Sequence, residues 1–204
     1  MKRILIACEF SGIVREAFKR RGWDAWSCDL LPTEIPGQHI QGDIFEALRT
    51  AGRFNLAILH PPCTYLSSSG LHWNKRRPGR ALLTEEAISF ATALWESACS
   101  LADSVAMENP VGCLSTRFLR PSQIIQPHEY GEDASKATCL WLHNLPPLAP
   151  TKHIAPRIVG GLKRWANQTD SGQNRLAPSE HRAADRSRTF PGIAEAMADQ
   201  WGGL

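Results

Sequence analysis

A cysteine and an acid–amide pair stand at the ends of two apolar runs in this sequence. Cys63 follows the apolar residues 56–59 and two prolines, and Glu108-Asn109 follows the apolar residues 105–107. Both runs are typical of buried strands, and open α/β sheets place their chemistry at the carboxyl ends of their strands. A thiol and a carboxyl group at such an edge suggest a nucleophile with a proton donor.

Short apolar runs alternate with helical patterns along the chain. Strands are predicted at residues 2–8, 23–28, 38–41, 56–60, 105–107, 124–126 and 138–142, and helices at 13–21, 44–50, 85–102 and 192–201. The alternation predicts an α/β fold with a mainly parallel sheet, and the two late strands predict an antiparallel hairpin at one edge. Thr84 is expected to cap the third helix, and the basic residues of the first helix are expected on its solvent face. Residues 71–84 and 143–186 are expected to be irregular.

Length and composition predict a single domain over residues 1–204, with a net charge of +3. The six cysteines form no C-x-x-C pair, so no metal site is predicted, and three of them (Cys8, Cys28 and Cys139) are expected in the core. No signal peptide or membrane-spanning run is visible, so a cytoplasmic protein without membrane contact is expected; the oligomeric state is left open. Basic residues cluster at 15–21, 75–80 and 182–188.

Three further strand ends carry residues suited to a nucleoside-containing cofactor. Phe10-Ser11-Gly12 forms a turn before a helix N-terminus, Asp29 ends the second strand, and Asp43 follows the third. The turn allows close backbone approach, and the two carboxylates suit a ribose diol and an adenine amino group. The structural alternative is that the aspartates are cap or turn residues.

Cys63 also admits more than one interpretation. A thiol at a strand–loop junction can be activated by positive charge or a helix N-terminus, which lowers its pKa. A structural cysteine would more often lie within a strand. A Cys–His hydrolase using His60 or His72 is less favoured, because no third residue is placed to orient the histidine.

Taken in order, these residues resemble the catalytic core of the DNA cytosine-C5 methyltransferases. Residues 10–12 resemble the family's Phe-x-Gly cofactor turn, and residues 62–70 resemble its Pro-Cys-Gln-x-Phe-Ser-x-x-Gly nucleophile loop. Residues 108–110 resemble its Glu-Asn-Val motif. Tyr130-Gly131 with Lys136 resembles the segment that ends in Arg-x-Arg, and residues 188–198 resemble the closing loop and helix.

The resemblance implies a Rossmann-like fold that binds S-adenosylmethionine, or a carboxylated analogue of it, and DNA with a flipped or single-stranded cytosine. The implied catalytic residues are Cys63, Glu108, Asn109 and Lys136. The implied cofactor-binding residues are Phe10, Ser11, Gly12, Asp29, Leu30, Asp43, Ile44, Pro61 and Arg188. The implied substrate-binding residues are Pro62, Thr64, Ser67, Thr138 and Arg186.

In the implied mechanism, the Cys63 thiolate adds to cytosine C6 and makes C5 nucleophilic. Glu108 hydrogen-bonds the N3 edge and protonates it, for which a raised pKa in a dry pocket is expected. Asn109 is expected to support Glu108 and the loop.

The sequence departs from the family's pattern in several places. Thr64 stands where Gln is usual, Val14 replaces a glycine of the cofactor turn, and Lys136 and Thr138 replace the Arg-x-Arg pair, whose role falls on Lys136 or on His128. The family's stretch before the closing helix is replaced by residues 187–192. Only residues 143–186 stand where a target-recognition domain is usual. They form either a reduced recognition loop or a solvated basic surface. A reduced loop predicts short or relaxed specificity, as in compact phage or prophage enzymes that modify their own DNA.

Three alternatives stay open. The substrate is a cytosine mononucleotide instead of DNA; or Arg186 and Arg188 select a donor with extra negative charge, from which a group larger than methyl is transferred; or the chain is an inactive DNA-binding protein. The presence of both Cys63 and Glu108 argues against the last alternative.

Overall fold

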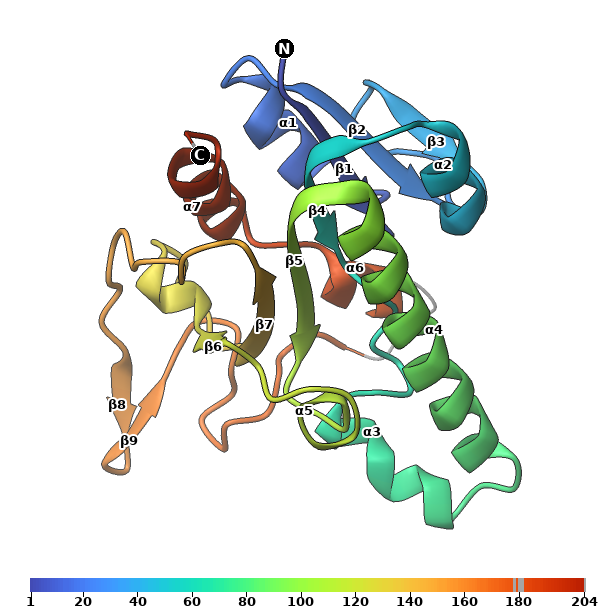
Figure 1. Cartoon of the computed structure of the whole chain (residues 1–204). Helices are drawn as coiled ribbons and strands as arrows, with labels where there is room; N and C mark the ends of the chain where they lie inside the picture. Colours follow the sequence, from blue (N-terminus) through green and yellow to red (C-terminus); the bar gives the residue numbers. More distant parts are fainter. Residues whose placement is uncertain (178, 180–181, 204) are drawn as a thin grey trace.

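A seven-stranded sheet forms the centre of the computed structural model, which describes residues 1–177, 179 and 182–203 (Figure 1). The strand order is β3-β2-β1-β4-β5-β7-β6. The strands are β1 (Arg3–Ala7), β2 (Asp24–Asp29), β3 (His39–Gln41), β4 (Phe54–Leu59), β5 (Ala102–Pro110), β6 (Gln123–Ile125) and β7 (Thr138–His143). All run parallel except β7, which is antiparallel to β5 and β6 on its two sides. The predicted α/β, Rossmann-like class with a mainly parallel sheet and an antiparallel pair at one edge is confirmed.

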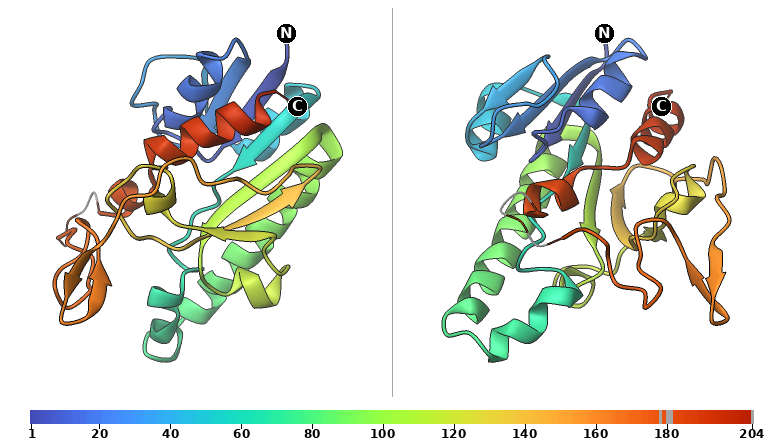
Figure 2. Two further views of the ribbon diagram at one scale, coloured as in Figure 1. Left: turned by 90° about the vertical axis from the view of Figure 1, so that its left-hand side faces the viewer. Right: turned by 180° about the vertical axis from the view of Figure 1, so that it is seen from behind.

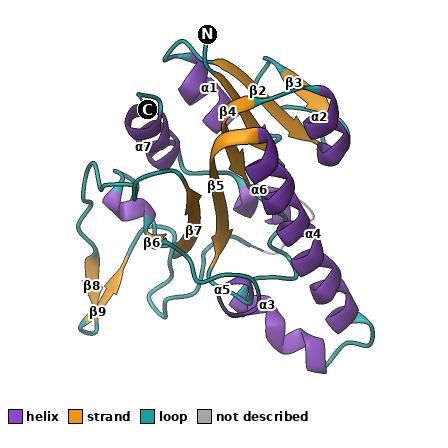
Figure 3. Ribbon diagram, in the orientation of Figure 1, coloured by secondary structure: helices purple, strands orange, loops and turns teal. Residues whose placement is uncertain are grey.

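Helices cover both faces of the sheet (Figures 2 and 3). Helices α1 (Ile13–Lys19) and α7 (Pro191–Trp201) lie against one face, and α2 (Ile44–Thr50) and α4 (Arg80–Leu101) against the other. Successive β1 residues therefore point into two different cores, with Ile4 and Ile6 in the first and Leu5 and Ala7 in the second. Burial on both faces explains why this strand reads as an unbroken apolar run. No described helix is long and apolar enough to span a membrane.

The parallel strands bring the predicted site residues to one edge of the sheet. The strand order reverses between β1 and β4, which is the position where doubly wound sheets open a crevice. At this point the backbone N–H of His60 donates to the Ala7 carbonyl at 3.0 Å. The residues that follow β1, β2, β3, β4 and β5 therefore surround one crevice.

Two predictions about single residues are wrong. Helix α4 begins at Arg80, so Thr84 does not cap it; Thr84 is buried in the helix, and its hydroxyl donates to the Tyr65 carbonyl at 3.1 Å. Arg15 does not face solvent. Its fully buried guanidinium binds Ser27, Thr33 and the Ile35 carbonyl, so it ties the loop after β2 to helix α1.

Two segments expected to be irregular contain short regular elements. Residues 71–84 contain the end of α3 (Ser68–Leu71), η1 (His72–Lys75) and the start of α4. Residues 143–186 contain the hairpin β8 (Arg157–Val159) with β9 (Leu162–Arg164), and most of α6 (Arg182–Ser187). Strands of three residues are too short to show a periodic pattern. The remaining elements are α5 (Leu114–Arg117) and η2 (Pro127–Glu129), and β5 extends past its predicted end at Met107 because it continues to pair with β7.

Candidate active site

The loop that carries Cys63 is folded back on itself and fastened to the segment after β5. The backbone N–H groups of Leu66 and Ser67 both donate to the Cys63 carbonyl at 3.1 Å. The Ser68 N–H donates to the Val111 carbonyl at 3.0 Å, and the Leu66 carbonyl accepts from the Cys113 N–H at 2.9 Å. These bonds hold the thiol at the end of β4 beside the end of β5.

Gly112 allows this close docking of the two segments. A Cβ atom at Gly112 would lie 1.9 Å from the Leu66 carbonyl oxygen and 2.9 Å from the Ser67 Cα. Neither atom belongs to a flexible side chain, so only glycine fits without moving the loop.

Glu108 and Asn109 lie on β5 and contact the neighbouring strand end. The Asn109 amide donates to the Pro61 carbonyl at 2.7 Å and so supports the loop that leads to Cys63. Glu108 is buried, and its Oε2 lies 3.1 Å from the Nδ1 of His60. The expected acid therefore has a histidine partner that directly follows the neighbouring strand β4.

Lys136 and Arg186 bring positive charge to the site from distant parts of the chain. The Lys136 Nζ donates to the Arg186 carbonyl at 3.1 Å, and the Thr138 hydroxyl donates to the Lys136 carbonyl at 3.1 Å. The Arg186 side chain is exposed and has no hydrogen-bond or ion-pair partner in the described part of the chain. His128, the alternative to Lys136, instead stacks on Trp165 at 4.1 Å.

The charge states at the site differ from those that the sequence suggests. Burial raises the pKa of the Cys63 thiol, and the nearby charges of Lys136 and Arg186 only partly oppose this effect. Burial also opposes ionisation of Glu108, but Lys136, His60 and Thr138 outweigh it and leave the pKa of Glu108 below its ordinary value. The expectations of a lowered Cys63 pKa and a raised Glu108 pKa are therefore both wrong for the unliganded protein.

A cavity of about 340 Å³ lies at the ends of β2 and β3. Four of the predicted cofactor residues, Asp29, Leu30, Asp43 and Ile44, line it together with Pro62, which was expected to contact substrate. Cys8 and Cys28 also line it, so the prediction that both are plain core residues is incomplete. Cys139 is buried in the core as predicted.

The two aspartates at this cavity each retain an oxygen for a ligand. One oxygen of Asp29 accepts from the Leu31 N–H at 2.9 Å, and one oxygen of Asp43 accepts from the N–H groups of Phe45 and Glu46. The second oxygen of each has no partner among the described residues. Two such carboxylates in a largely apolar cavity suit the hydroxyl groups and amino group of an adenosine moiety.

A second, much smaller cavity of about 10 Å³ lies beside the turn after β1. Phe10, Ser11 and Arg188 line it, with His60 and Glu9. Arg188 binds Glu34 at 2.5 Å and Asp185 at 2.6 Å, and its guanidinium lies 5.6 Å from the centre of the Phe10 ring. These contacts hold the segment around Arg188 against the turn Phe10-Ser11-Gly12 that follows β1.

Two predicted cofactor residues line none of the cavities described here. Gly12 has a φ of +75°, and a Cβ there would lie 2.7 Å from the buried Arg15 guanidinium, so packing and backbone conformation explain this glycine. Pro61 is buried, and its carbonyl accepts from Asn109. Neither position favours direct ligand contact.

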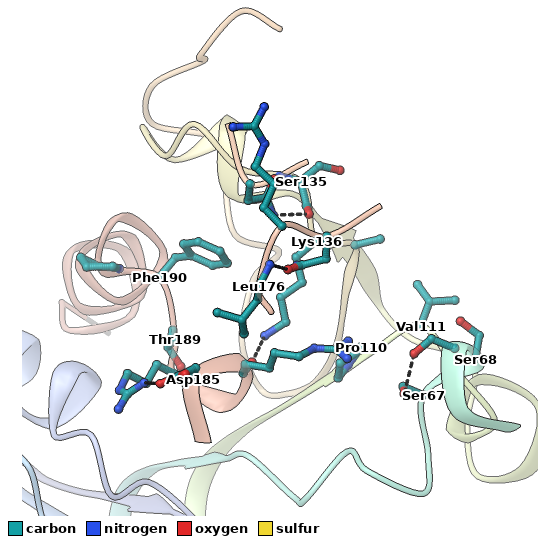
Figure 4. A pocket seen from close by; sticks show the side chains of 18 of the residues that line it. Ser67, Ser68, Pro110, Val111, Ser135, Lys136, Leu176, Asp185, Thr189 and Phe190 are labelled. Atoms are coloured by element: carbon teal, nitrogen blue, oxygen red, sulfur yellow. Dashed lines mark hydrogen bonds and ion pairs between the residues drawn. The ribbon is translucent and has the colours of Figure 1, made fainter. Parts of the chain in front are cut away.

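A cavity of about 760 Å³, the largest of the three described here, lies between the loop that carries Cys63 and residues 185–191. Figure 4 shows Lys136 reaching into it, with Phe190 on one side in this view and Val111 on the other. Its polar lining includes the following side chains: Ser67, Ser68, Ser69, Ser135, Lys136, Asn167, Asn174, Arg175, Asp185, Arg186 and Arg188. Two of the predicted substrate residues, Ser67 and Arg186, are among them. Thr64 is exposed outside it, where its carbonyl accepts from Arg80.

The three cavities are neighbours along the crevice. Cys8 lines both the 340 Å³ cavity and the small one, and Arg188 and Thr189 line both the small cavity and the largest one. The crevice therefore offers a nucleoside-sized cavity at one end and a large polar cavity at the other. Within the described ranges, no group of three or more His, Cys, Asp or Glu side chains is arranged to hold a metal ion.

Sequence reasoning missed two buried polar residues at the site. Glu9 is 4% exposed, and its carboxylate accepts from the Val14 N–H at 2.7 Å and the Arg15 N–H at 3.3 Å at the start of α1. His60 was considered only as the base of a Cys–His pair, and no hydrogen bond joins it to Cys63 among the described residues. Its position directly after a strand and before the two prolines was the available signal.

Neither a scan of protein-family models nor a search of curated proteins returns a match to this sequence. Among solved structures, the chain is similar to a prophage-encoded protein of Escherichia coli that is provisionally assigned as a DNA modification methyltransferase. The two share 14% identity with a TM-score of 0.44, over 70% of this chain. The aligned part is 46% of that protein, so this chain spans less than half of its length.

Proposed function

We propose that this chain is a DNA cytosine-C5 methyltransferase that uses S-adenosylmethionine. The observation that carries the proposal is the proximity of Cys63, Glu108 and Lys136, whose charges act on one another. The loop that carries Cys63 contributes Pro62 to the nucleoside-sized cavity and Ser67 to the large polar one. When bound, S-adenosylmethionine supplies an electrophilic methyl group. Asp29 and Asp43 would hold its adenosine part, and the residues around the small cavity would lie beside its methionine part.

In this proposal the chain's own residues act on the cytosine. The Cys63 thiol releases its proton to water, the resulting thiolate forms a bond to C6, and the electrons of the C5–C6 double bond shift toward C4 and N3. Glu108 donates a proton to the N3 edge, which makes C5 an enamine-like carbon that accepts the methyl group. Water then accepts the C5 proton, the electrons of that C–H bond re-form the C5–C6 double bond, and the C6–S bond breaks to release Cys63 as a thiolate. Asn109 holds the loop in place through the Pro61 carbonyl.

The charge distribution favours DNA over a mononucleotide as the substrate. Residues 60–84 and 134–169 both contribute to the largest cavity, and neither segment contains an Asp or Glu. Together they carry nine Lys and Arg residues against a net charge of +3 for the whole chain, so the remaining residues carry a net charge of −6. A polarised surface of this kind suits a polyanion that extends beyond one nucleotide.

The pairing of Arg188 favours an ordinary methyl donor. Its charge is already balanced by Glu34 and Asp185. Of the two arginines expected to select a carboxylated donor, Arg186 alone has no side-chain partner among the described residues. The transferred group is therefore expected to be methyl.

The test is nucleoside analysis by mass spectrometry of DNA from cells that express the chain. We expect 5-methyl-2′-deoxycytidine with the wild type and none above background with Cys63→Ser, which should still bind the donor because Cys63 does not line the 340 Å³ cavity. A heavier C5 substituent would reveal a modified donor. Tritium release from C5-labelled dCMP but not from DNA would refute DNA as the substrate, and no donor consumption with any cytosine substrate would leave only a binding protein.

A further inference from the structure

His60 is held rigidly at the centre of the crevice. Its backbone N–H donates to the Ala7 carbonyl, and its side chain is 7% exposed. The Nδ1 atom lies 3.1 Å from Oε2 of Glu108, which is within hydrogen-bond distance. The Nε2 atom is buried and has no partner among the described residues.

Charged and titratable groups face this pair from several elements. Glu9, which follows β1, lines the small cavity together with His60; burial raises the pKa of Glu9, and the charge of His60 opposes this effect. Lys136 and the Thr138 hydroxyl act on Glu108 from the segment around β7. The charges of Glu108, Lys136 and Arg186 act on the Cys63 thiol. Arg188 lines the small cavity together with His60. The imidazole therefore lies near two buried carboxyl groups, those of Glu108 and Glu9.

The proposed reaction requires a proton on the Glu108 carboxyl group. Glu108 must be protonated to serve cytosine N3, yet the charges of Lys136 and His60 outweigh burial, lower the pKa of Glu108 and favour its ionised form. Imidazole is the side chain whose ordinary pKa lies closest to neutrality. The Lys136 ammonium is the other nearby donor, and it is hydrogen-bonded to the Arg186 carbonyl.

We propose that His60 is a positioning residue that holds the Glu108 carboxyl in place and supplies the proton that neutralises it. The proton leaves Nδ1 of His60 and joins Oε2 of Glu108, so an imidazolium–carboxylate pair becomes a neutral imidazole and a carboxylic acid. The net charge of the pair stays at zero, so the step brings no new charge into a buried site. This role rests on the proposed function in one respect, which is that cytosine is the group to which Glu108 donates its proton.

The test uses Cys63 as a reporter in the protein without substrate or donor. The charge of Glu108 acts on the thiol, so the rate of Cys63 alkylation by iodoacetamide depends on the protonation of the His60–Glu108 pair. Peptide mass spectrometry separates Cys63 from the other five cysteines. In the wild type we expect alkylation to rise with pH in two steps, because the pair and the thiol titrate together.

His60→Asn keeps a hydrogen-bond donor near Glu108 but holds no exchangeable charge. It should reduce the profile to a single step and slow Cys63 alkylation at pH 6.5 by about tenfold, which corresponds to a rise of about one unit in the thiol pKa. His143→Asn, at the far end of β7, is the matched control and should leave the two steps unchanged. The kcat for tritium release should fall by about 10²-fold or more in His60→Asn, with the KM for the donor unchanged.

Glu108→Gln tests the same electrostatic coupling by changing the other member of the pair. It replaces the first variant if circular dichroism shows that His60→Asn does not fold. It removes the negative charge, so Cys63 alkylation should become faster than in the wild type and lose its second step. A wild-type profile in either folded variant overturns the role of His60. If the coupling is present but the wild type modifies no cytosine, the proposed function fails and the assignment of His60 stands.

Discussion

Replacement of Gly112 by alanine tests whether the Cys63 loop is positioned by close backbone docking. The new Cβ would lie 1.9 Å from the Leu66 carbonyl oxygen, whereas real Cβ contacts essentially never fall below 3.0 Å. The loop must therefore move by about 1.1 Å at this point. The two hydrogen bonds that fasten it, from Cys113 to Leu66 and from Ser68 to Val111, lie within two residues of the clash.

The magnitude follows from these contacts. Overpacking costs about 1–3 kcal/mol, and each weakened backbone hydrogen bond costs about 0.5–1.5 kcal/mol. The free energy of unfolding should fall by about 2–4 kcal/mol, less than the sum because movement of the loop relieves part of the strain. Cys63 moves with the loop, because its carbonyl is bonded to Leu66 and Ser67. A displacement of about 1 Å at a reacting atom lowers turnover by about 10²-fold.

The assays are urea unfolding, Cys63 alkylation and tritium release from DNA. Gly203→Ala is the matched control, since a Cβ there meets no atom within 4 Å. Gly70→Ala should fall between the two, because its nearest atoms are the Arg80 guanidinium at 3.1 Å and the Thr64 carbonyl at 3.3 Å. An unfolding free energy and a Cys63 alkylation rate equal to the wild type in Gly112→Ala would refute the claim that this docking positions the thiol.

Two further predictions concern the donor cavity and the closing segment. Asp29→Asn should weaken donor binding by about 10–150-fold in calorimetry, since a hydrogen bond to a charged group contributes about 1.5–3 kcal/mol, whereas Asp24→Asn, at the opposite end of β2, should leave it unchanged. Hydrogen bonding to Arg188 holds the pKa of Glu34 below its ordinary value, so this contact stabilises the fold above the unfolded-state pKa near 4.5, and its contribution is lost as the pH falls through the lower folded-state pKa. Glu34→Gln should lower the free energy of unfolding at pH 7 by less than about 1 kcal/mol, because both partners are partly exposed, and the difference from the wild type should vanish once the pH has fallen below the folded-state pKa; a constant difference across the acid range would contradict this origin.

The local sequence pattern was sufficient to predict most strands of the sheet. The runs that became β1, β2, β4 and β5 are apolar and bounded by turn residues, and such signals depend only on neighbouring positions. The same runs placed Asp29, Cys63 and Glu108 at strand ends, and the short run that became β3 placed Asp43. Because parallel strands share their carboxyl edge, this was enough to predict that these residues lie along one crevice.

Elements held by tertiary contacts were not predictable in this way. Hairpin β8–β9 has strands of three residues, and Trp165, next to it, stacks on His128 from η2. The start of α4 was misplaced because Thr84 resembles a helix N-cap in sequence. Its hydroxyl instead donates to the carbonyl of Tyr65, which is distant in sequence. Arg15 follows the helical pattern of a surface residue, and only the loop that surrounds it buries it.

The sequence by itself determined the chemical groups of the site and the edge of the sheet on which they stand, because strand formation and strand direction follow from short local patterns. Only the tertiary structure decided the environment of those groups. It brought Lys136 and Arg186 from far along the chain to Cys63, and His60 to Glu108. Burial and charge then reversed the expected pKa directions of Cys63 and Glu108, because desolvation and Coulomb interactions depend on neighbours in space and not on neighbours in sequence.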